Sequence, residues 1–145
     1  MTLEYTPDHL DWVCSLITVR LTPDLLVRTH RERNKEFPLF GHCHHASACL
    51  HLIFGKNFLE LYRAQDDEGI WHWWVQDNDD NIIDLTASQY TDRNLQAPYD
   101  RGRRHSIMGW RDGGPKKGVW GYSYAKRVKI LYDSVLMAIQ SQEKH

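Results

Sequence analysis

Three side chains between residues 43 and 84 have the types that a thiol-dependent enzyme uses. Cys43 follows Gly41 at the start of a segment with helical periodicity, and a helix N-terminus favours a thiolate. His72 lies among tryptophans in a segment rich in β-forming residues, and Asp84 follows two isoleucines. A thiolate needs an imidazole as its proton partner, and the imidazole needs a carboxylate or amide that orients it. The spacing therefore predicts a Cys-His-Asp triad with Cys43 as the nucleophile.

The elements that must position these residues are a helix and a strand hairpin. Pro38 and Gly41 predict a short loop before the helix. The run Asp77-Asn78-Asp79-Asp80-Asn81 is typical of a turn within an antiparallel hairpin. Positions 72 and 84 are almost opposite in this hairpin, so we expect His72 and Asp84 on one face. Periodicity and β-forming residues predict one helix and then three strands, at residues 43–54, 58–64, 70–76 and 82–85.

Predicted helices flank this core on both sides. Thr6-Pro7-Asp8 and Thr22-Pro23-Asp24 each combine an N-cap, a proline and an acid in the first turn, which predicts helices at about 7–19 and 23–34. Ser123 is predicted to cap a closing helix. We therefore expect a single α+β domain with N-terminal helices (1–40), the Cys-His-Asp core (41–90), a Gly- and Arg-rich loop (91–121) and a C-terminal helix (122–142).

The motifs around the three residues resemble those of the transglutaminase-like branch of the papain-like thiol enzymes. The matching stretches are Gly41-His42-Cys43-His44-His45-Ala46, His72-Trp73-Trp74 and Ile83-Asp84-Leu85-Thr86. Together with Ala87-Ser88-Gln89-Tyr90 and Gly102-Arg103, these stretches also resemble a set of small proteins common in phage genomes. The resemblance covers about residues 22–90, the Gly-Arg step and the closing helix.

This resemblance implies a papain-like core in which the nucleophile helix packs on a short antiparallel sheet. It implies Cys43 as nucleophile, His72 as general base and then acid, and Asp84 as the group that orients His72. The backbone N–H of Cys43 would contribute to the oxyanion hole. The implied reactions are acyl transfers from a protein or peptide amide: proteolysis, glutamine deamidation or crosslinking. No cofactor is implied, and the substrate of a phage-encoded enzyme would be a host protein.

The residues that would support the triad depart from the family pattern. Papain-like enzymes use an upstream glutamine, and none occurs in the 42 residues before Cys43. Asn34 is a candidate substitute, with His42 and Trp73 as further candidates for oxyanion or support roles. His44 and His45 stand where bulkier apolar or aromatic neighbours are expected, which puts the surroundings of the thiol in question.

Other interpretations of the same residues remain open. Cys43 could be a buried small hydrophobic residue, as we expect for Cys14 and Cys49. The histidines around Cys43 suggest zinc, but adjacent helical residues point about 100° apart and no CxxC pair is present, so no metal site is expected.

A basic segment follows the predicted core. Residues 101–129 contain nine basic residues and one acid, whereas residues 66–84 contain seven acids and no Lys or Arg. Arg103, Arg104 and Trp110 are candidates for substrate or partner binding. The segment suits a solvated surface loop, a lid over the thiol cleft, or a site for nucleic acid or another acidic partner. The last option defines an alternative function, a non-catalytic binding module.

The composition is that of an ordinary globular protein. The 145 residues carry a net charge of −1, with 41% hydrophobic and 26% charged residues, so one hydrophobic core can form. The apolar runs are too short to span a bilayer and the start does not resemble a signal peptide, so no membrane partner is expected. Three cysteines without a CxxC pair indicate a reducing, cytoplasmic setting, the host cytoplasm for a phage-encoded protein.

Overall fold

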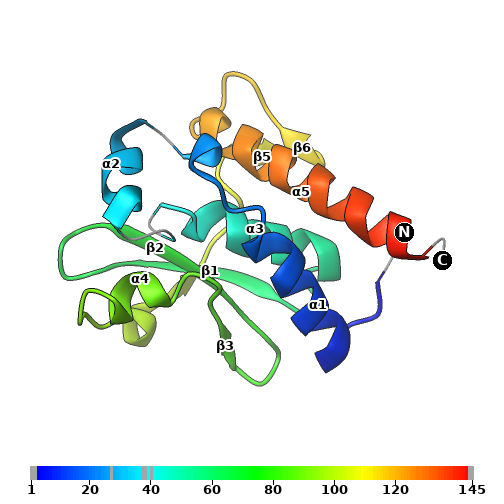
Figure 1. The fold of residues 1–145 in the computed structure, drawn as a ribbon, viewed down its shortest axis with the longest axis horizontal. Coiled ribbons are helices and arrows are strands. Elements are labelled where there is room, and N and C mark those ends of the chain that lie inside the picture. Colours follow the sequence, from blue (N-terminus) through cyan, green and yellow to red (C-terminus); the bar gives the residue numbers. More distant parts are fainter. Residues whose placement is uncertain (1–2, 27, 37–38, 40, 144–145) are drawn as a thin grey trace.

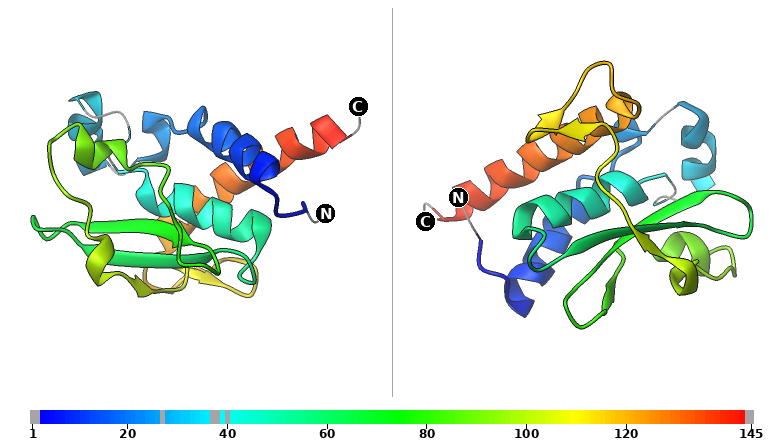
Figure 2. Two further views of the ribbon diagram at one scale, coloured as in Figure 1. Left: turned by 90° about the horizontal axis from the view of Figure 1, so that it is seen from below. Right: turned by 180° about the vertical axis from the view of Figure 1, so that it is seen from behind.

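The computed structural model of the protein describes residues 3–26, 28–36, 39 and 41–143 and has an α+β fold (Figure 1). A small antiparallel sheet forms one layer, and helix α3 (Cys43–Phe54) packs on it. Helices α1 (Pro7–Thr18) and α5 (Tyr122–Glu143) pack on the other side of α3, as Figure 2 shows. The mixed fold class and the helix at residues 43–54 are therefore as the sequence predicts.

The sheet has four strands in the order β3-β2-β1-β4, and all neighbouring strands are antiparallel. The central pair runs from Glu60 opposite Gln76 to Gln65 opposite Trp71. The short edge strands flank this pair on either side. The bounds are β1 Glu60–Gln65, β2 Trp71–Gln76, β3 Ile82–Ile83 and β4 Arg103–Arg104.

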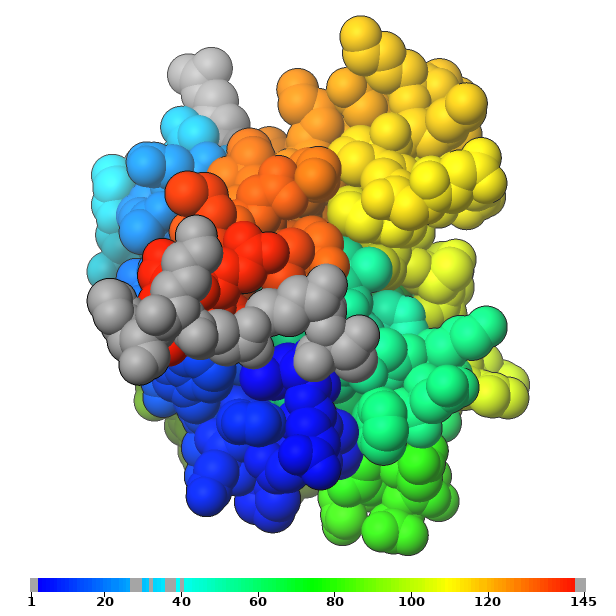
Figure 3. All heavy atoms as spheres, turned by 90° about the vertical axis from the view of Figure 1, so that its right-hand side faces the viewer, coloured from blue at the N-terminus to red at the C-terminus, as the bar shows by residue number. Residues whose placement is uncertain are grey.

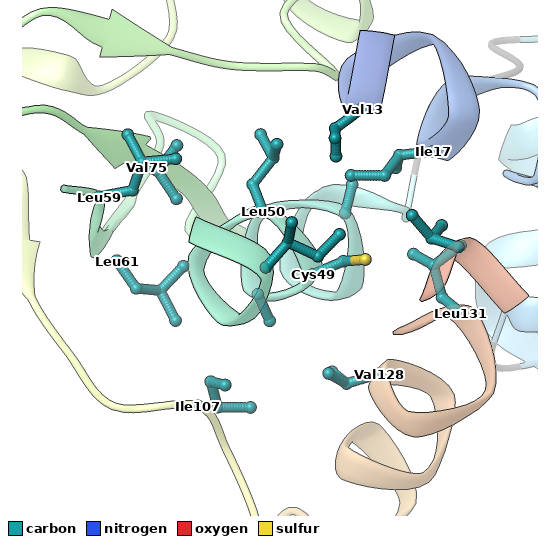
Figure 4. Close-up of a cluster of buried hydrophobic side chains, with 14 of the residues drawn as sticks. Val13, Ile17, Cys49, Leu50, Leu59, Leu61, Val75, Ile107, Val128 and Leu131 are labelled. Atoms are coloured by element: carbon teal, nitrogen blue, oxygen red, sulfur yellow. The ribbon is translucent and has the colours of Figure 1, made fainter. Parts of the chain in front are cut away.

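Helix α3 is the centre of the core because ten of its twelve residues are buried, as expected for a helix covered on both sides. In Figure 4, Cys49 and Leu50 of α3 lie between side chains of the sheet and side chains of the outer helices. Cys49 is buried, and Cys14 is partly buried against the same cluster. The sheet and the outer helices contribute Leu59, Leu61, Val75, Val13, Ile17, Val128 and Leu131.

The ends of the helices agree with most of the local signals. Thr6 Oγ1 accepts a hydrogen bond from the His9 backbone N–H at 3.1 Å, so the predicted N-cap of α1 is confirmed. Gly55 ends α3 with a φ of 89°. Helix α5 begins at Tyr122, so Ser123 lies in its first turn, and the predicted cap at Ser123 is wrong.

The prediction of one helix over residues 23–34 is wrong. A 3-10 turn, η1 (Pro23–Leu25), is followed by Leu26 in an extended conformation (φ −94°, ψ 148°) and then by α2 (Arg28–Glu36). Leu25 and Leu26 are both buried. In one continuous helix these consecutive side chains would point about 100° apart, whereas the extended backbone at Leu26 turns them in other directions. Tertiary packing thus overrides the local helix signal. The loop predicted at Pro38 lies outside the described residues.

Residues 91–121 are mostly turns and irregular structure, in keeping with the predicted loop, but they also contain short strands that the sequence did not predict. This part of the chain contributes β4 to the sheet and folds into a hairpin that packs against α5, as Figure 3 shows for the yellow and orange segments. The elements beyond β3 and before α5 are α4 (Ser88–Thr91), η2 (Tyr99–Arg101), β4, β5 (Trp110–Arg111) and β6 (Gly114–Pro115). No helix in the described part of the chain combines the length and hydropathy that a membrane span requires.

Candidate active site around Cys43

Cys43 is the first residue of α3 and lines a cavity of about 300 Å³ between this helix, the sheet and the start of α5. The residue is only 8% exposed. Gly41 has a φ of 88°, and a Cβ there would lie 2.8 Å from Leu26 Cδ2 and 3.1 Å from His30 Cβ. The glycine two residues before Cys43 is therefore required both by its backbone conformation and by the close approach of α2 and the preceding turn.

His72 and Asp84 are in direct contact behind the cavity wall. The distance between His72 Nε2 and Asp84 Oδ2 is 2.6 Å, and both side chains are buried. Strand β3 ends at Ile83, so the prediction that Asp84 lies in a strand is wrong. The register pairs Val75 with Ile83, which places Asp84 diagonal to His72 and not opposite it. Cross-strand diagonals remain within reach of long side chains, so the contact forms.

Asp84 is held by donors on both of its oxygens. Oδ1 accepts hydrogen bonds from the Thr86 backbone N–H at 3.0 Å and from Thr86 Oγ1 at 3.2 Å. Oδ2 accepts from Tyr99 Oη at 2.6 Å as well as from His72. Burial raises the pKa of Asp84, but these hydrogen bonds and the charge of His72 outweigh burial, so its pKa is lowered. Asp84 is therefore a well-fixed anion.

Asp84 and the nearby thiol of Cys43 both act on the pKa of His72. Burial lowers this pKa, but the hydrogen bond to Asp84 and the influence of Cys43 and of the Asp84 charge outweigh burial and raise it to about 9. Gln89 Nε2 lies 2.8 Å from His72 Nδ1 and so contacts the ring nitrogen that does not bind Asp84. The Cys43 Sγ lies 3.9 Å from the carbonyl oxygen of Trp71 at the start of the same strand. The structure thus brings His72 and Asp84 into direct contact, and Cys43 lies near enough to His72 to affect its pKa.

His44 presents an unpaired donor next to the thiol. Its Nε2 accepts a hydrogen bond from the Met108 backbone N–H at 3.3 Å, so the proton of the neutral ring is on Nδ1. Nδ1 is buried and has no hydrogen-bond partner among the described residues. Burial, with the nearby charges of His105 and Arg63, lowers the pKa of His44 to about 3. His44 lines the same cavity as Cys43. An acceptor for its Nδ1–H would therefore have to be a water molecule or a ligand bound in this cavity.

The cavity combines aromatic walls with cationic groups. Its aromatic lining comes from β2, from the end of the 91–121 segment and from α5: Trp71, Trp73, Trp120 and Tyr124. Three arginines line it, Arg63, Arg93 and Arg127, together with one acid, Asp66.

The remaining predicted site residues are not all at this cavity. Asn34 is buried on α2, and His42 is buried with its Nδ1 2.7 Å from His45 Nε2, but neither lines the cavity. Trp73 lines it, with its ring centroid 4.6 Å from that of His44. The described residues contain no group of three or more His, Cys, Asp or Glu side chains that could hold a metal ion.

The basic and aromatic candidates of the 101–129 segment separate in the structure. Arg103 and Arg104 are exposed on β4 and line a second hollow beside the first. Trp110 on β5 packs against the hydrophobic core and lines neither hollow. Met108 and Trp120 of the same segment do line the Cys43 cavity.

Sequence reasoning missed three residues that hold the site together: Thr86, Gln89 and Tyr99. Thr86 and Gln89 follow Asp84 in a turn that continues into α4. The sequence signal that could have indicated them is a threonine and, three residues later, a glutamine close behind the carboxylate. Tyr99 comes from a 3-10 turn fifteen residues after Asp84, and no local pattern marks it.

Comparison with known proteins does not identify a family for this chain. No protein-family model matches the chain, and no match was found among curated proteins or solved structures.

Proposed function

We propose that the protein is a thiol enzyme that transfers the acyl group of a protein or peptide amide to water or an amine through Cys43. One observation carries this proposal. The buried ring of His72 is hydrogen-bonded to the carboxylate of Asp84 at 2.6 Å, and Asp84 together with the nearby Cys43 raises its pKa to about 9. A fully buried histidine would otherwise be neutral at pH 7. The arrangement therefore supports a thiolate and an imidazolium held as an ion pair.

The two charged groups have complementary roles in the reaction. The Cys43 thiolate attacks the carbonyl carbon of the amide and forms a tetrahedral intermediate. As the C–N bond breaks, the imidazolium of His72 gives the proton of Nδ1, the ring nitrogen that does not bind Asp84, to the leaving nitrogen, and a thioester remains on Cys43. The Gln89 amide moves away from Nδ1 for this step. Water or an amine then attacks the thioester, His72 takes up a proton from this nucleophile, and the thiolate leaves. Asp84 stays ionised and orients the ring.

Gln89 serves as a positioning residue for His72. Its amide lies 2.8 Å from Nδ1, and a 3.4 Å contact with Thr86 Oγ1 connects it to the turn that holds Asp84. Since the oxygen and nitrogen of an amide are interchangeable by rotation, Gln89 can donate to the neutral ring or accept from the protonated ring. The ring therefore keeps its orientation in both protonation states.

The negative charge of the tetrahedral intermediate needs donors that are already in place. The backbone N–H of Cys43 at the start of α3 is one such donor, because first-turn amides have no intrahelical partner. We assign the second to Nδ1–H of His44, which is buried without an acceptor in the described part of the chain. Leaving such a donor unpaired costs about 1–3 kcal/mol. A substrate oxygen that accepts from Nδ1–H would remove this cost.

The layer arrangement supports a papain-like, transglutaminase-like core. The nucleophile is at the N-terminus of the central helix, and the histidine comes from a strand of the antiparallel sheet on which that helix packs. The carboxylate follows the neighbouring strand. Such a constellation is defined by geometry and roles, and it recurs on unrelated chains.

Alkylation by iodoacetamide tests the proposal with internal controls. At pH 6 we expect rapid labelling of Cys43 and slow labelling of Cys14, because burial and the charge of Asp11 raise the pKa of Cys14 to about 11. The rate at each cysteine is measured by peptide mass spectrometry. His72→Ala should slow labelling of Cys43, whereas the control His9→Ala, on α1, should not. Equal rates at Cys43 and Cys14 in the native protein would refute the proposal.

A further inference from the structure

The Cys43 cavity continues into a second hollow on the β1 and β4 side of the sheet. This second hollow has a volume of about 590 Å³ and contains Arg103 and Arg104 in its lining. The two hollows share Arg63, Asp66 and Trp71. The two hollows therefore adjoin one another at these residues, and a polypeptide bound along both would cross the strand residues that line the second.

The path along both hollows is rich in positive charge, and acids of the protein compensate a part of it: Arg93 pairs with Glu68 at 2.7 Å, and Arg104 pairs with Glu60 at 3.6 Å. Besides the three arginines of the thiol cavity, the second hollow is lined by Arg101, Arg103, Arg104 and His105, and the acids along the whole path are Asp66 and Asp67. Each of these acids is already engaged within the protein.

The carboxylates of Asp66 and Asp67 are engaged within the protein, so they repel an acidic substrate only weakly. Asp66 Oδ1 accepts from the Glu68 and Ile70 backbone N–H groups at 2.9 Å, and Oδ2 accepts from Tyr90 Oη at 2.8 Å. Asp67 pairs with Arg101 at 2.9 Å. Their charges thus fix the turn after β1. Arg63 and Arg103 line the second hollow and form no ion pair with a described residue.

Arg63 occupies the junction between the two hollows. Its guanidinium carbon lies 4.0 Å from the centroid of the Trp71 ring and 5.5 Å from that of Trp73. Stacking on two tryptophans holds the guanidinium in place and leaves its edge for hydrogen bonds. A fixed guanidinium beside the nucleophile favours a carboxylate, which it can bind through two parallel hydrogen bonds.

We propose that the acyl donor is an acidic polypeptide segment. Its carboxylates contact Arg63, Arg103 and Arg104 along the second hollow, and it presents its scissile amide to Cys43. This inference rests on the proposed thiol chemistry and adds the class of substrate. Both the position of Arg63 and the excess of cations select against basic segments, because like charges brought together in a hollow repel strongly.

A nucleic acid fits this path less well than an acidic peptide. Single-stranded nucleic acid needs exposed aromatic faces on which bases stack. One face of Trp71 is covered by Arg63, and the His105 ring packs edge-on against Trp73 at a centroid distance of 5.5 Å. Trp110 packs against the core. The second hollow, as far as the described residues form it, therefore offers guanidinium groups and only the uncovered part of Trp71 for stacking, since the exposed Trp120 belongs to the thiol cavity.

Three matched electrophilic peptides test the inference. Each carries the same chloroacetamide group, which alkylates a thiol, and the residues that flank it are Glu, Gln or Lys. We expect the Glu peptide to label Cys43 at least about tenfold faster than the Gln peptide at low salt, with the Lys peptide slowest. The advantage should shrink as the salt concentration rises. The double variant Arg103→Gln/Arg104→Gln should lose most of it, whereas the control Arg111→Gln, which alters an exposed arginine outside both hollows, should keep it.

Iodoacetamide, a small neutral reagent, separates failure of this inference from failure of the proposed function. It should label Cys43 at the same rate in the native protein and in the arginine variants. Fast iodoacetamide labelling with equal rates for the three peptides would overturn the acidic substrate alone. Slow iodoacetamide labelling in the native protein would overturn the thiol chemistry and the inference with it. An oligodeoxythymidine that binds through Arg103 and Arg104 and blocks the Glu peptide completely at equal concentration would assign the hollow to nucleic acid instead.

Discussion

Two buried histidines next to Cys43, His72 and His44, have opposite electrostatic environments. Burial acts on both rings, yet the pKa of His72 is raised to about 9 because Asp84 and Cys43 outweigh burial. The pKa of His44 is lowered to about 3, because burial is reinforced by the nearby charges of His105 and Arg63. Burial by itself thus produces a neutral imidazole, and a fixed carboxylate together with the nearby thiol produces a cation.

The comparison assigns different tasks to the two rings. A cation beside the thiol can stabilise a thiolate and give up a proton, whereas a neutral ring can donate a hydrogen bond without changing charge. The hydrogen bond from the Met108 N–H to His44 Nε2 fixes which nitrogen of His44 donates. The predictions that follow either remove this difference between the rings or resolve it further.

Asp84→Asn should convert His72 into a second neutral histidine. Without the carboxylate, burial dominates the pKa of His72, and Cys43 loses its cationic partner at pH 7. We expect the rate of iodoacetamide labelling of Cys43 to fall by about 100-fold or more. Asp79→Asn removes the same charge from the exposed hairpin turn and is the matched control. Equal labelling of the two variants would show that Asp84 does not control the thiol.

His44→Asn and His44→Gln should separate the two nitrogens of the neutral ring. The Asn amide nitrogen is close to the position of Nδ1, whereas the Gln amide nitrogen is close to that of Nε2. We expect His44→Gln to slow acylation by p-nitrophenyl acetate by about 100-fold and His44→Asn to retain most of the rate. Iodoacetamide labelling has no carbonyl oxyanion and should be unchanged in both. An equal loss of acylation in both variants would exclude the proposed donor role.

The stability of the native protein should pass through a maximum near pH 6.5. The pKa of His72 in the folded state, about 9, exceeds the unfolded value of 6.5, so its contribution is present below pH 6.5 and is lost as the pH rises to about 9. We expect this loss to be about 3 kcal/mol. The pKa of His44 is lowered, so its contribution is present above pH 6.5 and is lost as the pH falls towards 3.

Urea unfolding between pH 4 and 9 measures both limbs of this curve. Asp84→Asn should flatten the alkaline limb and steepen the acid limb, because burial then lowers the pKa of His72 as it does that of His44. His44→Asn should reduce the acid limb only in part, because burial also lowers the pKa of His42 to about 4 and that of His45. An alkaline limb that persists in Asp84→Asn would mean that His72 is not its source.

Tyr99→Phe should give the smallest effect. It removes one of the donors on Asp84 Oδ2 and leaves His72 and both Thr86 donors in place. The carboxylate keeps its charge, so the pKa of His72 should stay above 6.5, and labelling of Cys43 should change by less than about tenfold. Tyr132→Phe, on α5, is the control. A loss as large as that in Asp84→Asn would show that the hydroxyl, and not the carboxylate charge, sets the behaviour of His72.

The sequence predicts the central part of the site because its signals are local. Cys43 follows a glycine at the start of a helix, and His72 lies in a strand, so residue type and spacing were sufficient for both. The register of a two-residue strand depends on the turn and on packing, so the diagonal position of Asp84 was not predictable.

The supporting residues depend on contacts between distant parts of the chain. Tyr99 reaches Asp84 from a 3-10 turn, and Met108 reaches His44 from 64 positions away in the chain, so neither contact has a sequence pattern. The same holds for the break at Leu26, where burial of two consecutive leucines overrides a clear helix-start signal. The fold class follows from periodicity, whereas the pairing of β4 with β1 requires the folded chain.

The titration of His72 tests the central claim most directly. Two-dimensional NMR of ¹⁵N-histidine-labelled protein reports the protonation of both ring nitrogens of each histidine between pH 5 and 10. We predict that His72 is an imidazolium at pH 7.5, loses its proton near pH 9, and becomes neutral at pH 7.5 in Asp84→Asn. A neutral His72 at pH 7 in the native protein would contradict the thiolate–imidazolium pair.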